Sequence, residues 1–407
     1  MKNRIEGCRQ AALDILKPSR KQFEYALDLH RDALVWDAYG FSPSGISDYS
    51  RIEKMKNENA SADELTIAKE EEGALKCLFS NEVARIYREI WDASGVDCIF
   101  QNAGEEGNSV ERMILRLARF TAVTDTQKDL YMRAVFPRDV EKAKTLNKKS
   151  LFMTTNGIPL PVSFRNENDL LFYIHVFFEF GVRMMHLTYN RRNLIGDGCA
   201  EKSDAGLSDF GKKVIAEMNR VGVIPDVAHC GQRTSLEAAI ESKLPVVASH
   251  SVCHSLVDHC RAKKDEVIKA IAKSGGYVGI VILNDMLGGT GDINALLNHI
   301  DYVAENFGTD YIAIGSDACF NMVKTKPLQI IKRKNYESFW PAEWGKYRVK
   351  IDPDYNSLAW TNWPIFTLGM HMRGYSDEDI RKILGLNIMR VCKQTMSASE
   401  YVTMIRE

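Results

Sequence analysis

The sequence predicts an α/β protein that forms a (β/α)₈ TIM barrel, and two observations support this prediction. Eight short apolar runs, many rich in β-branched residues, alternate with segments of helical length, which is the pattern that eight βα units require. Histidines follow two of these runs, at the strand end where such barrels place their chemistry. A doubly wound open sheet is the alternative fold. The eight runs are residues 33–37, 97–102, 151–155, 182–188, 223–228, 245–249, 277–283 and 311–316.

Length and composition are those of a globular protein with one large core. The chain has 407 residues, of which 45% are hydrophobic, so we expect a single barrel domain over residues 1–407. Its 53 basic and 54 acidic side chains nearly balance, which gives no reason to expect nucleic acid or an anionic membrane as partner. A small-molecule partner fits this balance better. The nine cysteines lack CxxC spacing and no apolar stretch is long enough to cross a membrane, so we expect a cytoplasmic protein with reduced thiols.

Two segments depart from the βα alternation. Residues 42–95 are rich in Lys, Glu and Asn and predict a helical insertion after the first strand. Residues 321–407 form a C-terminal extension, in which a helix beginning near Ser376 closes the outer ring. The extension contains Trp340, Trp344, Trp360 and Trp363. Tryptophans in a loop-rich segment are more typical of a packed subdomain or a subunit contact than of a substrate wall.

His229 and His250 are the candidate metal ligands. Each closes an apolar run, so both imidazoles point into the mouth of the predicted barrel. A single histidine is more often a core residue, and the shared context of the two favours a metal site. Cys230 and Cys253 adjoin the site in sequence, but alternation along a strand turns a neighbour away, so we expect buried thiols. A literal His-x-Asp pair, His30 and Asp32, precedes the first strand and belongs to the opposite end of the barrel.

Ordered motifs across most of the barrel resemble those of the membrane dipeptidase (renal dipeptidase) family. This resemblance implies an amidohydrolase-like barrel with two zinc ions that hydrolyses dipeptides or close analogues. The closing segment 377–387 is similar to the family's last helix. The motifs lie at residues 187–199, 205–211, 217–222, 226–229, 248–251, 261, 275–279 and 315–317.

The resemblance also implies a ligand set, and this chain matches it only in part. His229 and His250 occupy two of the family's metal-ligand positions. The His-x-Asp expected after the first strand falls at Tyr39 and Phe41, and the bridging glutamate falls at Asn156. Phenylalanine cannot bind a metal, and a neutral amide cannot bridge two cations. We therefore expect one zinc ion at most, with Tyr39 and Asn156 facing the substrate.

Three further positions match family residues that act on the substrate. Asp317 matches the residue that binds the substrate amine and transfers the proton, and Arg261 matches the one that binds the substrate carboxylate. A guanidinium suits a carboxylate and a strand-end aspartate suits acid/base catalysis. Tyr189 replaces a substrate-facing histidine. Alternatives are a helix N-cap for Asp317 and a surface position for Arg261.

Three functions follow from these residues. The first is a metal-dependent hydrolase of a dipeptide or small amide with a carboxylate, using metal-activated water. The second is a metal-free homologue that performs lyase or isomerase chemistry with Asp317, Tyr39, Tyr189 and the histidines. The third is a binding protein without activity that retains Arg261. The family resemblance and the tryptophan-rich segment are compatible with a homodimer.

Overall fold

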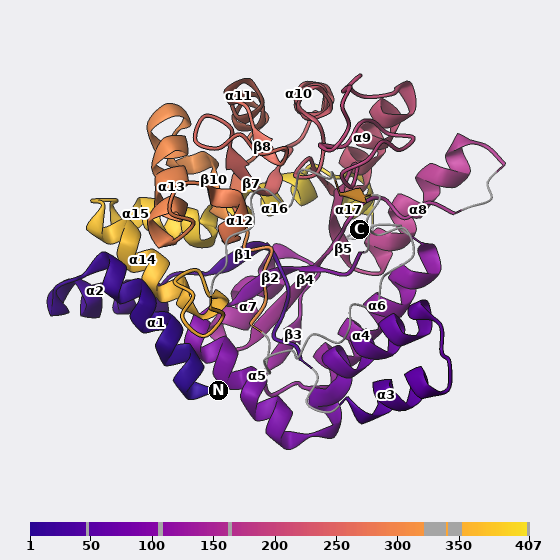
Figure 1. Cartoon of the computed structure of the whole chain (residues 1–407). Helices are drawn as coiled ribbons and strands as arrows, with labels where there is room; N and C mark the ends of the chain where they lie inside the picture. Colours follow the sequence, from indigo (N-terminus) through magenta and orange to yellow (C-terminus); the bar gives the residue numbers. More distant parts are fainter. Residues whose placement is uncertain (46–48, 105–108, 162–164, 321–338, 341–351, 405–407) are drawn as a thin grey trace.

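Eight parallel strands form the centre of the molecule, and helices surround them (Figure 1). The structure is a computed structural model and describes residues 1–45, 49–104, 109–161, 165–320, 339–340 and 352–404. Each of the eight predicted runs overlaps one strand. The strands are β1 (Trp36–Gly40), β2 (Cys98–Asn102), β4 (Lys149–Thr155), β5 (Val182–His186), β6 (Ile224–Asp226), β7 (Ala248–Cys253), β9 (Val278–Ile280) and β10 (Ile312–Ile314).

Backbone hydrogen bonds close these strands into a ring. One sheet runs β1-β2-β4-β5-β6 and the other runs β10-β9-β7. The sheets join between β6 and β7, where the Val227 N–H donates to the Val247 carbonyl at 2.8 Å. They join again between β10 and β1, where the Asp317 N–H donates to the Tyr39 carbonyl at 2.9 Å. The predicted barrel is therefore confirmed, and the open-sheet alternative is wrong.

Two short strands were not predicted. β3 (Tyr131–Arg133) pairs with β4, and β8 (Ala262–Lys263) pairs with β7. Both are too short to give a period-two pattern, and each ends in a basic residue. They lie outside the ring of eight.

The predicted insertion after β1 is helical. Within it, Ser61 and Glu64 form a capping box that starts α4, and α5 ends at Gly95 with a φ of 64°. Ser208 caps α9 (Asp209–Val221), because its side chain accepts the N–H of Gly211. No helix of the described residues is long and apolar enough to cross a membrane. The helices up to the eighth barrel strand are α1 (Lys2–Leu16), α2 (Arg20–Asp32), α3 (Ser50–Asn57), α4 (Ala62–Phe79), α5 (Asn81–Ser94), α6 (Val110–Thr126), α7 (Pro137–Thr145), α8 (Glu167–Glu179), α9 (Asp209–Val221), α10 (Gln232–Glu241), α11 (Asp265–Lys273), α12 (Asn284–Leu287), α13 (Ile293–Phe307) and the 3₁₀ turn η1 (Thr309–Tyr311).

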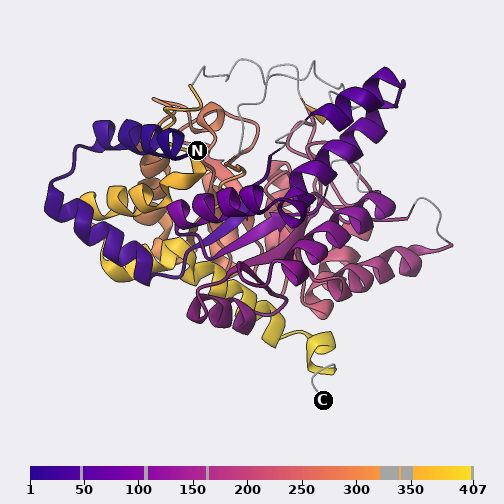
Figure 2. The ribbon, with the colours of Figure 1, turned by 90° about the horizontal axis from the view of Figure 1, so that it is seen from below.

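The C-terminal extension packs onto the barrel. Trp360 and Trp363 are fully buried, and α14 lies beside α2 in both ribbon views (Figures 1 and 2). The Trp360 indole Nε1–H donates to Asp37 in β1 at 3.0 Å, so the extension stabilises the first strand. Trp344 lies outside the described residues. The elements of the extension are η4 (Trp360–Asn362), α14 (Trp363–Met372), α15 (Asp377–Arg381), the π-helical turn η5 (Lys382–Leu386), α16 (Asn387–Ser397) and α17 (Glu400–Met404).

The barrel interior is apolar below and polar at its mouth. Trp36, Phe100 and Phe152 pack on one another inside the strands, with ring centroids 5.2–5.5 Å apart. Met184 and Ile224 belong to the same buried cluster. Two residues further along the same two strands, the inward positions become polar. This change places chemistry at the carboxyl ends of the strands.

Candidate active site

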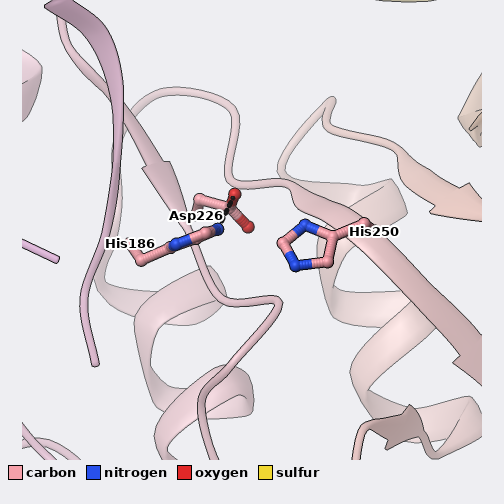
Figure 3. A group of neighbouring side chains, drawn as sticks. All are labelled: His186, Asp226 and His250. Atoms are coloured by element: carbon pink, nitrogen blue, oxygen red, sulfur yellow. Dashed lines mark ion pairs between the residues drawn. The ribbon is translucent and has the colours of Figure 1, made fainter. Parts of the chain in front are cut away.

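Three side chains from adjacent strands meet at the barrel mouth. His186 ends β5, Asp226 ends β6 and His250 lies in β7, and all three are fully buried. One nitrogen or oxygen from each lies within 4.8 Å of the others, and Figure 3 shows them facing one another. Two imidazoles and a carboxylate form a donor set suited to a catalytic zinc ion, because they leave a coordination position open.

His186 and Asp226 form an ion pair. The His186 Nε2 lies 2.7 Å from Asp226 Oδ2. The other carboxylate oxygen accepts the N–H groups of Ala228 at 2.9 Å and Ser249 at 3.0 Å. Burial by itself raises the pKa of Asp226, but the charge and hydrogen bond of His186 and the bonds from Ser249 outweigh it and lower the pKa. Asp226 is therefore an ionised, fixed acceptor.

His229 and His250 face each other through their Nε2 atoms, which lie 3.0 Å apart. The Nδ1 atom of His229 lies 2.6 Å from Asn190 Oδ1, and that of His250 lies 2.8 Å from Ser249 Oγ. Burial, followed by the charge of Arg261, lowers the pKa of both histidines well below the ordinary value, so both are neutral. Two neutral nitrogens at this distance need a proton or a cation between them.

Aromatic rings line the same mouth. The Tyr39 ring stacks on His250 with centroids 3.9 Å apart, and the Tyr189 ring stacks on His229 at 4.2 Å. The Tyr39 hydroxyl donates to Asn156 Oδ1. Tyr39 and Asn156, which stand at two of the ligand positions that the family resemblance implies, are thus hydrogen-bonded to each other.

Arg261 and Asp317 come from different parts of the mouth, since Arg261 precedes β8 and Asp317 follows β10. Arg261 is buried, and its Nε and Nη2 donate to the carbonyls of Ala228 and His250, both at 2.9 Å. It therefore holds the ends of β6 and β7 in place, whatever it binds besides. Asp317 follows β10 with a φ of 50° and is partly exposed. Its left-handed backbone is uncommon for a non-glycine residue and is typical of functional sites.

His186 and Asp226 are the site residues that the sequence reasoning missed. They pair in register on neighbouring parallel strands, and each lies two residues beyond an interior apolar residue, Met184 or Ile224. That alternation is visible in the sequence and points both side chains into the barrel. By contrast, His30 hydrogen-bonds Thr367 Oγ1 and the Ser94 carbonyl, away from this cluster.

Comparison with solved structures supports this fold. An amidohydrolase from Pseudomonas aeruginosa superposes with a TM-score of 0.69 at 24% identity, covering 91% of this chain and 98% of its own. A metallopeptidase from Rhodobacter sphaeroides, solved with a phosphinate mimic of the dipeptide L-Ala-D-Ala, gives a TM-score of 0.61 at 16% identity, covering 89% and 100%. At these identities the likeness is one of fold.

Sequence comparison gives the family. Dipeptidase verJ from Clonostachys rogersoniana is 26% identical over 230 residues, which are 56% of this chain and 51% of that protein. Dipeptidase tcpJ from Claviceps purpurea (strain 20.1) is 24% identical over 226 residues, 54% and 46%. The chain thus spans about half the length of these curated relatives. Residues 36–337 match the membrane dipeptidase family (Peptidase family M19), and the protein belongs to this dipeptidase-like hydrolase family.

Proposed function

We propose that this protein hydrolyses a dipeptide or a related small amide with a free carboxylate, using at most one zinc ion. The observation that supports this most directly is the meeting of His186, Asp226 and His250 at the barrel mouth. Membership of the dipeptidase family supports the reaction class. The dipeptide mimic bound by the Rhodobacter sphaeroides metallopeptidase supports the substrate class.

The residues do not fit a second ion. At the positions where the family resemblance implies ligands, this chain has Tyr39, Phe41 and Asn156. The Tyr39 hydroxyl bonds to Asn156, and the Tyr39 ring covers His250. These groups offer no carboxylate to bridge and neutralise two divalent cations.

The residues do fit one ion. A His₂-carboxylate set is among the ligand sets of catalytic zinc, and His250 belongs both to it and to the His229 pair. In our proposal His186, Asp226 and His250 would hold the ion, and His229 lies alongside. Because His186 Nε2 and Asp226 Oδ2 lie 2.7 Å apart, a bound ion would compete with their mutual contact.

Other residues of the mouth position the substrate in this proposal. A bound zinc ion supplies Lewis-acid activation of water near neutral pH. Asp317, fixed by its backbone bond to Tyr39, accepts and returns the proton at its carboxylate. Arg261 presents positive charge behind the histidines for the substrate carboxylate, and Tyr189 forms a wall over His229.

A metal-free lyase or isomerase is the second candidate. Three groups capable of proton transfer lie together, because the Tyr39 ring stacks on His250 and His250 faces His229. Tyrosine and histidine are competent general acids and bases. In this alternative the His186–Asp226 pair orients the substrate.

Metal content tests the proposal. The protein is purified without a metal-affinity step, and zinc is measured by mass spectrometry before and after dialysis against zinc. We expect close to one equivalent, lost in His186→Ala and retained in the control His371→Ala, which lies in α14 away from the mouth. A zinc-loaded protein that releases amino acids from a dipeptide library supports the hydrolase. A protein that refuses zinc contradicts it and favours the second candidate.

A further inference from the structure

Cys199 and Cys260 form a pair of thiols beside the barrel mouth. Cys199 lies in the segment between β5 and α9, and Cys260 lies between β7 and β8. Both line one pocket although they are 61 residues apart in the chain, and each thiol influences the pKa of the other. Both are partly exposed, whereas Cys8, Cys77, Cys98, Cys230, Cys253 and Cys392 are buried. Among the described residues these two thiols are therefore placed to react together and to meet a solute.

A cavity gives access to the pair. A pocket of about 540 Å³ is lined by both cysteines, and its other charged side chains are of both signs, with Arg233 and Lys264 beside Glu201, Asp204, Asp258 and Glu266. This volume admits a small solute. The neighbouring Cys199 thiol and the charge of Arg261 lower the pKa of the Cys260 thiol against the effect of burial, so Cys260 is the more nucleophilic partner.

The pair also connects to the histidines of the mouth. The single S–H of Cys199 donates to Asn190 Oδ1 at 3.3 Å. The same oxygen lies 2.6 Å from His229 Nδ1, and Asn190 is fully buried. A change at Cys199 thus reaches His229 through one shared oxygen.

We propose that Cys199 and Cys260 are a peroxide-reactive dithiol that closes to an intramolecular disulfide and so changes the hydrogen bonding of His229. The oxidant is a hydroperoxide. The Cys260 sulfur attacks its terminal oxygen, the O–O bond breaks, and the leaving oxygen takes a proton, so that Cys260 becomes a sulfenic acid. The Cys199 sulfur then attacks the Cys260 sulfur, and water leaves with the Cys199 proton. Two thiols are oxidised by two electrons in all, and one hydroperoxide is reduced.

Closure has two structural consequences. The segment that carries Tyr189 and Asn190 becomes tied to the segment that carries Arg261. The thiol proton that binds Asn190 Oδ1 is lost, so this oxygen serves His229 alone. Neither consequence depends on the hydrolase proposal.

Peptide mapping under non-reducing conditions tests the proposal. The full-length protein is treated with hydrogen peroxide, alkylated and digested, and its free thiols are counted. We expect a Cys199–Cys260 linked peptide, the loss of two of the nine free thiols, and full recovery with dithiothreitol. Cys319→Ser, which removes the other partly exposed cysteine, should leave the link intact, whereas Cys199→Ser and Cys260→Ser should each abolish it.

The other outcomes overturn the proposal. They are sulfinic acid at Cys260 without a link to Cys199, oxidation of a buried cysteine before this pair, or no reaction of either thiol. Thermal melting of the serine variants shows whether they are folded. If either variant is not folded, mapping of the wild-type protein alone decides, because the linked peptide either forms or does not.

Discussion

The two sides of the barrel mouth differ in the kind of polar group they present. On the side of β5, β6 and β7, His186, Asp226, His229 and His250 offer a charge and several metal donors. On the side of β1 and β4, Tyr39 and Asn156 offer a neutral hydrogen bond. The same barrel therefore presents a cluster of potential metal donors on one side and an uncharged hydrogen bond on the other.

The pKa shifts of two buried aspartates, Asp37 and Asp226, illustrate the difference between the two sides of the mouth. Burial raises the pKa of Asp37 in β1 to about 6, despite hydrogen bonds from Ser316 and Trp360. Burial acts on Asp226 in β6 as well, but the positive partner His186 brings its pKa below the ordinary value. Burial thus raises the pKa of a carboxyl in this barrel unless a basic partner offsets it, as His186 does for Asp226. This contrast favours the side of β5 to β7 for the proposed cation.

The largest expected effect comes from His250. It belongs to the cluster with His186 and Asp226 and also faces His229, so its loss removes a donor from either arrangement. In His250→Gln we expect zinc affinity to fall by about 100-fold or more, since changes of residues that only support ligands already cost 10–100-fold. Competition with a fluorescent chelator measures the affinity.

His229 is the matched comparison for this prediction. Among the described residues it is outside the three-residue donor cluster, so His229→Gln should weaken zinc binding less than His250→Gln. Equal losses in both variants would contradict the proposed ligand set and favour an ion held by His229 and His250 alone.

Restoring donors on the neutral side should create a second site. In the triple variant Tyr39→His, Phe41→Asp and Asn156→Glu, we expect zinc content to rise from one equivalent to two, because an acidic bridge can then neutralise both ions. Mass spectrometry of the dialysed protein measures it. Asn156→Glu alone serves as the control. Without the donors that Tyr39→His and Phe41→Asp introduce, its single carboxylate should hold no second ion. A folded triple variant that still binds one ion would show that this side is closed by shape rather than by donor chemistry.

The fold was predictable because the barrel repeats one signal eight times. Each apolar run between helical segments overlaps a strand, and the length of the chain suits one such barrel. The short strands β3 and β8 could not be found, since two or three residues with a basic end give no periodicity. The packing of Trp360 against Asp37 joins positions 323 apart, which no local pattern encodes.

The site was predictable where a motif marks a strand end. His229 and His250 were found this way, and they do lie together. His186 was overlooked because it lies inside an apolar run, where its role depends on register with Asp226 rather than on local context. Substrate roles for Asp317, Arg261, Tyr189, Asn156 and Tyr39, together with the cytoplasmic location and the homodimer, stay predictions.

Asp37 and Asp226 should affect the pH dependence of the free energy of unfolding differently. The folded pKa of Asp37 is about 6, above its unfolded value near 3.8, so the stability it contributes is full below pH 3.8 and is lost as the pH rises through 6. In wild-type protein this amounts to about 2 kcal/mol between pH 4 and pH 7, and Asp37→Asn should remove it. Guanidinium unfolding at both pH values measures the difference.

Asp226→Asn is the control for that experiment. Because the pKa of Asp226 is lowered, its titration lies below this pH range, and the difference from wild type should stay nearly flat between pH 4 and pH 7. A slope for Asp226→Asn as steep as that for Asp37→Asn would contradict the contrast between the two sides.

The smallest effect concerns the neutral contact itself. Tyr39→Phe removes the hydroxyl that donates to Asn156 and leaves a buried amide oxygen without that bond, so the free energy of unfolding should fall by about 1–3 kcal/mol while zinc content is unchanged. Tyr277→Phe is the matched control, because that buried hydroxyl has no hydrogen-bond partner among the described residues and its removal should cost nothing. If Tyr39→Phe instead abolished zinc binding, the hydroxyl would be a ligand or its support, and the two sides of the mouth would form one site.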